Sequence, residues 1–140
     1  MLNIMQFVRV FVAAALLPLV VACSGQPPHW YRVKPSGLMA GEQIQQLIAG
    51  GSIGGYNQFG NPYTITYGVD HQLTGYAGWK KEFADKGAWW VESNQMCWKW
   101  QNWRNAETFC YETAHTGRYL RWFDETGEQV SQATFSAAAR

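Results

Sequence analysis

The sequence is poor in cysteine and histidine, the residues that most redox and zinc sites require. It contains three of each in 140 residues. No two cysteines are spaced as C-x-x-C, so a thioredoxin-like site or a zinc ribbon has no support. The histidines lie in a Pro-rich segment and at predicted turns, where three or four ligands do not converge, and we expect no metal and no cofactor. The residues concerned are Cys23, Cys97, Cys110, His29, His71 and His115.

Charged residues are also scarce, which limits the expected partners and chemistry. They make up 15% of the chain, with 11 Lys and Arg against 10 Asp and Glu and no basic cluster. Nucleic acid is therefore not an expected partner. The sequence alone cannot place any two carboxylates at the separation that glycoside hydrolysis requires. The G-x-S-x-G match at residues 50–54 follows a predicted helix, whereas a nucleophile elbow follows a strand. We expect that the protein is not an enzyme.

Long apolar runs are absent except for one near the N-terminus. Residues 10–22 are almost wholly apolar, and Pro18 lies within them. The run is shorter than the roughly 20 residues that a membrane-spanning helix needs. Following a short segment with one basic residue, Arg9, it is typical of a signal peptide.

The apolar run ends in Leu19-Val20-Val21-Ala22-Cys23, which resembles the lipobox of bacterial lipoproteins. The resemblance implies cleavage before Cys23 and attachment of lipid to it. The alternative is an ordinary secretory signal with an incidental cysteine. Ser24, in place of an aspartate, implies the outer membrane, facing the periplasm. We predict a lipoprotein signal peptide at 1–22, a lipidated Pro-rich tether at 23–37, and one β-barrel domain at 38–140 that is held to the membrane through Cys23.

Aromatic residues are abundant, with 8 Trp and 7 Tyr, and they concentrate in residues 96–111. This segment predicts a β-hairpin turning about residues 102–105, which places Cys97 opposite Cys110. Opposed residues in a non-hydrogen-bonded pair allow a disulfide, for which we expect a Cα separation of about 4.4–6.8 Å. Strand alternation then gives the hairpin one aromatic face toward the core. That face consists of Met96, Trp98, Trp100, Phe109 and Tyr111.

Around this hairpin, short β-type runs alternate with turn signals. The pattern predicts a mainly β fold with one short N-terminal helix and about eight strands. Such a meander is typical of a small antiparallel up-and-down barrel or a barrel-like sandwich. The predicted first strand has a weak β pattern, so the sequence does not decide whether this strand closes the barrel. We predict a helix at 38–49, a turn at 85–87, and strands outside the hairpin at 52–59, 63–69, 73–79, 88–92, 118–124 and 128–135.

The run G-A-W-W-V-E-S-N-Q-M-C-W-K-W, followed later by C-Y, is similar to a family of small secreted proteins and lipoproteins of proteobacteria. That family has a G-x-W…C-x-x-W…C-Y pattern and unknown function. The resemblance covers about residues 38–135. It implies a compact, lipocalin-like β-barrel with one disulfide and no established activity. The matching positions are Gly87, Trp89, Cys97, Trp100, Cys110 and Tyr111.

The tryptophans are the main candidates for binding. Trp98, Trp100 and Trp122 either fill a small barrel or line a cup that receives a ligand. Trp103 lies at the predicted hairpin tip beside Arg104, where we expect a substantially exposed ring that contacts a partner or a membrane. In the alternative, the loop curls over the barrel mouth and buries the ring. The candidate binding residues are Trp98, Trp100, Trp103, Arg104 and Tyr111.

These features favour a non-enzymatic cell-envelope lipoprotein whose disulfide-clipped barrel binds a small ligand or a protein partner. An inhibitor is a sharper version, suggested only by analogy with other small-barrel lipoproteins. One alternative is a structural envelope component with a filled core. The last alternative is a small hydrolase. A cavity in the barrel would favour the first function, and a packed interior would favour the second.

Overall fold

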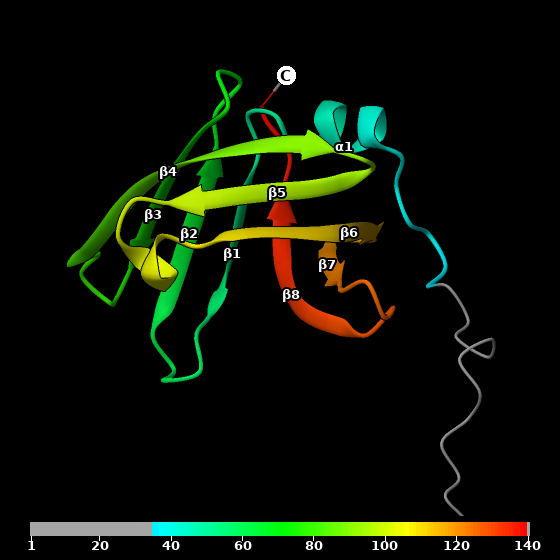
Figure 1. The fold of residues 1–140 in the computed structure, drawn as a ribbon. Helices are drawn as coiled ribbons and strands as arrows, with labels where there is room; N and C mark the ends of the chain where they lie inside the picture. Colours follow the sequence, from blue (N-terminus) through cyan, green and yellow to red (C-terminus); the bar gives the residue numbers. More distant parts are fainter. Residues whose placement is uncertain (1–34, 140) are drawn as a thin grey trace, which may run out of the picture.

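In the computed structural model, which describes residues 35–139, eight antiparallel strands close into a barrel (Figure 1). This confirms the mainly β prediction and selects the barrel over the sandwich. The predicted signal peptide, Cys23 and most of the tether lie outside the described residues. The elements in chain order are α1 (Gly41–Ile48), β1 (Ser52–Tyr56), β2 (Pro62–Tyr67), β3 (Gln72–Ala77), β4 (Phe83–Glu92), β5 (Gln95–Trp100), η2 (Trp103–Ala106), β6 (Thr108–Thr116), β7 (Tyr119–Phe123) and β8 (Gln129–Ser136).

The barrel is closed by β1, the strand whose role in closure the sequence did not decide. Each strand pairs with the next along the chain, and β8 returns to pair with β1. The closing ladder joins Ser52 to Ser136 and Ile53 to Phe135. Ile53 and Phe135 are both buried. Apolar burial at this pair therefore compensates for the weak strand propensity of the glycines that follow in β1.

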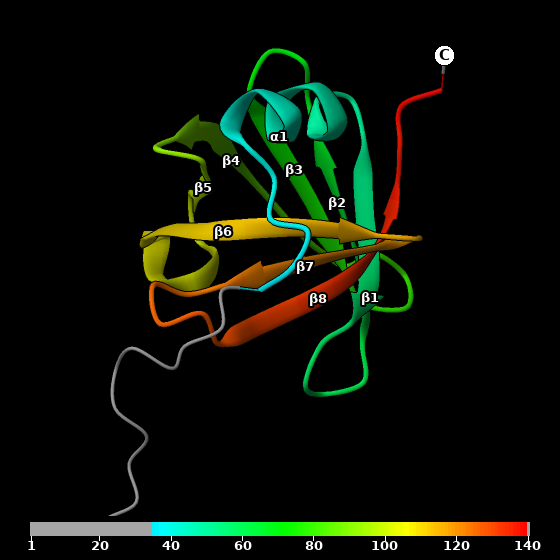
Figure 2. The same ribbon diagram turned by 90° about the vertical axis from the view of Figure 1, so that its right-hand side faces the viewer.

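Helix α1 covers one end of the barrel, here called the closed end (Figures 1 and 2). Ile44 and Ile48, one turn apart, are fully buried there. The backbone N–H of Gly41 donates to Asn94 Oδ1 at 2.8 Å, which ties the helix start to the β4–β5 turn. The helix begins three residues later than predicted, because Leu38 forms a β-bridge with Ala114 instead.

The opposite end, here called the open end, has no α-helix over it in the described part of the chain. It is framed by the loops that join β1 to β2, β3 to β4, β5 to β6 and β7 to β8 (Figure 2). Within residues 35–139, no helix has the length and apolarity needed to cross a membrane.

The central hairpin has the predicted register. Cys97 pairs with Cys110 and Lys99 with Thr108, and a disulfide joins the two cysteines. Their Cα separation is 4.1 Å, just below the predicted range. The predicted turn was too short. The connection contains η2, in which Arg104 and Asn105 have the positive φ angles of the left-handed region.

The predicted turn at residues 85–87 is wrong, because all three residues lie inside β4. Gly87 is opposite Trp100, and a Cβ there would collide with the carbonyl oxygen of Lys99. The glycine thus allows close strand approach rather than a reversal of the chain. The chain reverses earlier, where Gly78 has a φ of +92° and precedes the loop to β4.

Candidate functional site

The barrel encloses a cavity of about 1000 Å³ that extends to the open end. Half of its lining residues are aromatic, because inward positions of β2, β5, β6 and β7 carry rings. The deep ring residues are Tyr63, Tyr67, Trp98, Trp100, Tyr111 and Trp122. The barrel is therefore only partly filled by its own side chains, and the space that remains is of the size of a small-molecule site.

All five candidate binding residues line this cavity: Trp98, Trp100, Trp103, Arg104 and Tyr111. Trp98 stands at the centre of the ring cluster. Its ring centroid lies 5.5 Å from that of Tyr111 and 6.1 Å from that of Trp122. The guanidinium carbon of Arg104 lies 4.3 Å from the ring centre of Phe109, so this cation is held over an aromatic face. The structure thus brings the predicted residues into one site without assigning them a ligand.

Trp103 is not substantially exposed, and that prediction is wrong. Its side chain is half-buried and packs against the core. The ring lies 4.8 Å from that of Trp100 and sits over Gly75, where a Cβ would collide with both indoles. The loop therefore curls over the barrel mouth, as in the alternative interpretation, and Trp103 no longer supports contact with a protein partner.

Asp85 holds this loop in place from the inner side of β4. One carboxylate oxygen accepts hydrogen bonds from the backbone N–H groups of Asn102 and Trp103, at 2.9 and 2.7 Å. The other accepts one from Asn102 Nδ2 at 3.0 Å. Burial alone raises the pKa of the Asp85 carboxyl, but the hydrogen bonds from Trp103 and Asn102 outweigh burial and lower the pKa below its ordinary value. A charged Asp85 thus positions the aromatic loop.

Polar side chains in the lining are almost all uncharged. Burial raises the pKa of Tyr63, and burial followed by the proximity of Tyr63 raises that of Tyr67, so both phenols stay protonated. Trp122 is buried, and its indole Nε1 has no hydrogen-bond partner among the described residues. Arg104 is the only charged side chain among the described residues of the lining. The site therefore suits a largely uncharged, ring-containing molecule.

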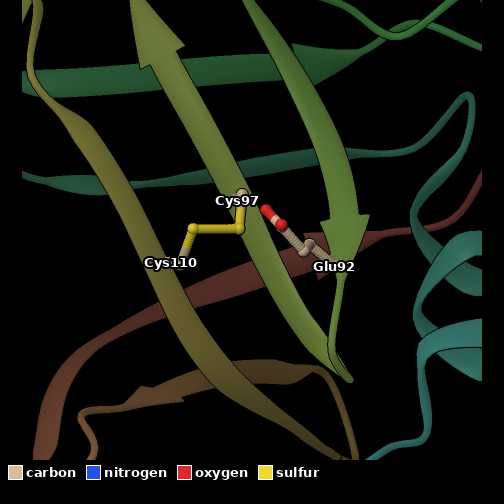
Figure 3. A group of neighbouring side chains, drawn as sticks. All are labelled: Glu92, Cys97 and Cys110. Atoms are coloured by element: carbon tan, nitrogen blue, oxygen red, sulfur yellow. A yellow bond between two sulfur atoms is a disulfide. The ribbon is translucent and has the colours of Figure 1, made fainter.

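One cluster in the described part of the chain has the composition of a metal site, but not its chemistry. A carboxylate oxygen of Glu92 and the sulfurs of Cys97 and Cys110 lie within 4.8 Å of one another (Figure 3). The two sulfurs are bonded to each other as a disulfide. Zinc binds thiolates, so this pair supplies no sulfur ligand.

The sequence analysis missed the rim of the cavity and the role of Asp85. The rim positions lie in the β1–β2 loop and at the ends of β1, β4 and β8, where strand alternation is too short to show which side chains face the mouth. Asp85 belongs to an Asp-Lys-Gly triplet, which locally favours a turn. The only signal for an inward Asp85 was its even spacing from Trp89 along one strand. Using that signal required knowing that β4 begins at Phe83. The additional rim residues are Tyr56, Asn57, Gln58, Phe59, Asn61, Phe83, Val130, Ser131 and Gln132.

Comparison with known proteins adds no further constraint. No protein-family model, curated protein or solved structure matches this chain. The resemblance to the proteobacterial family therefore stays a prediction that rests on the sequence pattern.

Proposed function

We propose that this protein is a non-enzymatic cell-envelope lipoprotein that binds one small ring-containing ligand in the cavity. The observation that carries the proposal is the cavity of about 1000 Å³ with its aromatic lining. That volume falls at the upper end of the usual range for ligand pockets. A structural component with a filled core is less consistent with such a space.

The chemistry of the lining supports an uncharged ligand body. Rings prefer offset or edge contacts with other rings, and Trp98, Tyr111 and Trp122 already meet each other in this way. The protonated phenols of Tyr63 and Tyr67 offer hydrogen-bond donors.

The envelope address rests on the sequence and is compatible with the disulfide. A disulfide between Cys97 and Cys110 favours an oxidising compartment such as the periplasm. The lipobox-like segment ending at Cys23 supplies the proposed anchor. Cys23→Ala is expected to release the protein into the soluble fraction, because one acylated cysteine is the only covalent lipid anchor proposed. Undiminished membrane association of this variant would contradict the lipoprotein proposal.

Ligand binding is tested with N-phenyl-1-naphthylamine, an uncharged two-ring fluorescent probe. We expect saturable binding with one probe per protein. Ala77 lines the cavity, so Ala77→Phe fills part of it and should weaken binding by about tenfold, equal to about 1.4 kcal/mol. Ala88→Phe is the matched control, since Ala88 is exposed on the same barrel and is not part of the lining. Equal weakening by both variants, or no saturable binding to the parent, would contradict the proposal.

A further inference from the structure

The exposed apolar side chains of the described residues gather at one end of the barrel. Seven large hydrophobic residues are strongly exposed, and six of them lie at the open end. Phe59 is 78% exposed and Trp79 is 71% exposed. The exception, Val69, is 75% exposed and lies near the closed end. The six at the open end are Tyr56, Phe59, Tyr76, Trp79, Phe83 and Val130.

These side chains, here called the apolar rim, are continuous with the cavity. Tyr56 at the end of β1 and Trp79 in the β3–β4 loop have ring centroids 6.3 Å apart. Tyr56, Phe59 and Phe83 also line the cavity, so apolar surface runs from the outside of the mouth to the inside. An exposed and contiguous apolar surface of this kind marks a contact with a partner or a membrane.

The described chain begins at the same end as the apolar rim. Pro35, its first residue, has its Cδ atom 3.6 Å from the position of a Cβ built on Gly127. Gly127 belongs to the β7–β8 loop, which frames the open end (Figure 2). Cys23 precedes Pro35 by twelve positions, a length that reaches at most about 40 Å when extended. An acyl group on Cys23 would therefore be connected to the barrel through the end that carries the apolar rim.

The charges around the mouth favour a zwitterionic surface. Lys80 and Lys81 follow Trp79 directly, and the Lys81 ammonium lies 5.8 Å from the centre of the Tyr76 ring. Such a mixture of aromatic and lysine side chains suits the headgroup region of a membrane. Glu82 in the same loop, and acidic residues in the β7–β8 loop, oppose a strongly anionic surface. The acidic residues of that loop are Asp124, Glu125 and Glu128.

From this arrangement we propose that the open end docks on a zwitterionic lipid bilayer, with Phe59 and Trp79 at the membrane interface. This inference rests on the proposed acyl anchor at Cys23. The cavity mouth then faces the membrane, and the helix-covered closed end faces away from it.

The test uses the acylated full-length protein in vesicles of phosphatidylcholine and phosphatidylethanolamine. A nitrobenzoxadiazole dye is attached at Phe59→Cys and, in a matched control, at Val69→Cys. The two positions are similarly exposed but lie at opposite ends of the barrel. Lipids brominated in their acyl chains should quench the dye at position 59 at least threefold more than the dye at position 69. Trp79→Ser in the first protein should reduce that difference.

The outcomes separate this inference from the proposed function. Equal quenching at both positions in an acylated chain overturns the docking alone and leaves the apolar rim for a protein partner. A chain whose N-terminal peptide carries no acyl group, and which does not float with vesicles, overturns the lipoprotein proposal and the docking together. Ligand binding in the cavity is measured separately and is affected by neither result.

Discussion

The two ends of the barrel differ in whether their apolar side chains are buried or exposed. At the closed end, α1 covers the strands and buries Ile44 and Ile48 completely. At the open end, Phe59 and Trp79 stay exposed, and the interior holds a cavity rather than a plug. The closed end thus has the character of a folded core, whereas the open end is held in shape by a few specific contacts. Substitutions should accordingly cost more stability at the closed end than at the open end.

The largest effect is expected for Trp89→Ala near the closed end. Trp89 is fully buried, and its indole Nε1 donates to the Gly68 carbonyl oxygen at 2.9 Å. Truncation leaves a cavity and an unpaired acceptor, so the free energy of unfolding should fall by about 3–5 kcal/mol. Urea unfolding followed by far-UV circular dichroism measures this. A loss below about 1 kcal/mol would show that the closed end is not the main source of stability.

Trp103→Ala tests the open end with the same side chain. Because Trp103 is half-buried and its ring packs at a tilt against that of Trp100, we expect a loss of about 2 kcal/mol, between an ordinary surface change and a core truncation. The same urea experiment applies. A change within about 0.5 kcal/mol would mean that the loop does not cover the mouth in solution.

Asp85→Asn tests whether the charge of the side chain, rather than its shape, holds the β5–β6 loop in place. Asparagine keeps the size of the side chain but loses the charged acceptor for the N–H groups of Asn102 and Trp103. Hydrogen bonds to charged groups stabilise more than neutral ones, so the expected loss at pH 7 is about 1–2 kcal/mol. Thermal melts of the two proteins at pH 7 measure it, and an equal or higher melting temperature in the variant would contradict the role assigned to Asp85.

The pH dependence of stability provides a second test of the Asp85 carboxylate. Because folding lowers the pKa of Asp85, its contribution is present above the ordinary carboxyl value of about 3.9 and is lost as pH falls through the lower folded value. The difference in melting temperature between the parent and Asp85→Asn should therefore shrink below about pH 4. A gap that stays constant down to pH 2 would point to packing instead of charge.

The smallest effect is expected for Phe59→Ser at the rim, with Val69→Ser as the matched change near the closed end. Both side chains are strongly exposed, so each variant should stay within about 0.5 kcal/mol of the parent in urea unfolding. If Phe59→Ser alone costs more than this, the apolar rim is part of the folded core and is not available for docking.

The sequence predicted the elements whose periodicity is local and missed those set by contacts across the barrel. Alternation around Trp98 and Trp100 gave the inward face of the central hairpin, and the register that pairs Cys97 with Cys110 was correct. The exposure of Trp103 was wrong because it depends on Asp85, which is 18 residues away in the chain. No period in a sequence reports that a carboxylate from one strand will fix the loop between two others.

The meander order of the strands also bears on how the barrel assembles. Every pairing joins neighbours in the chain except the one between β1 and β8, whose Ser52–Ser136 contact spans most of the domain. Closing a longer loop costs more chain entropy, and non-local pairs form late. The local hairpins can therefore assemble first as an open, curved sheet with two free edges. The cavity comes into existence only when the short β1 strand seals that sheet, so binding competence is acquired in the last step of folding.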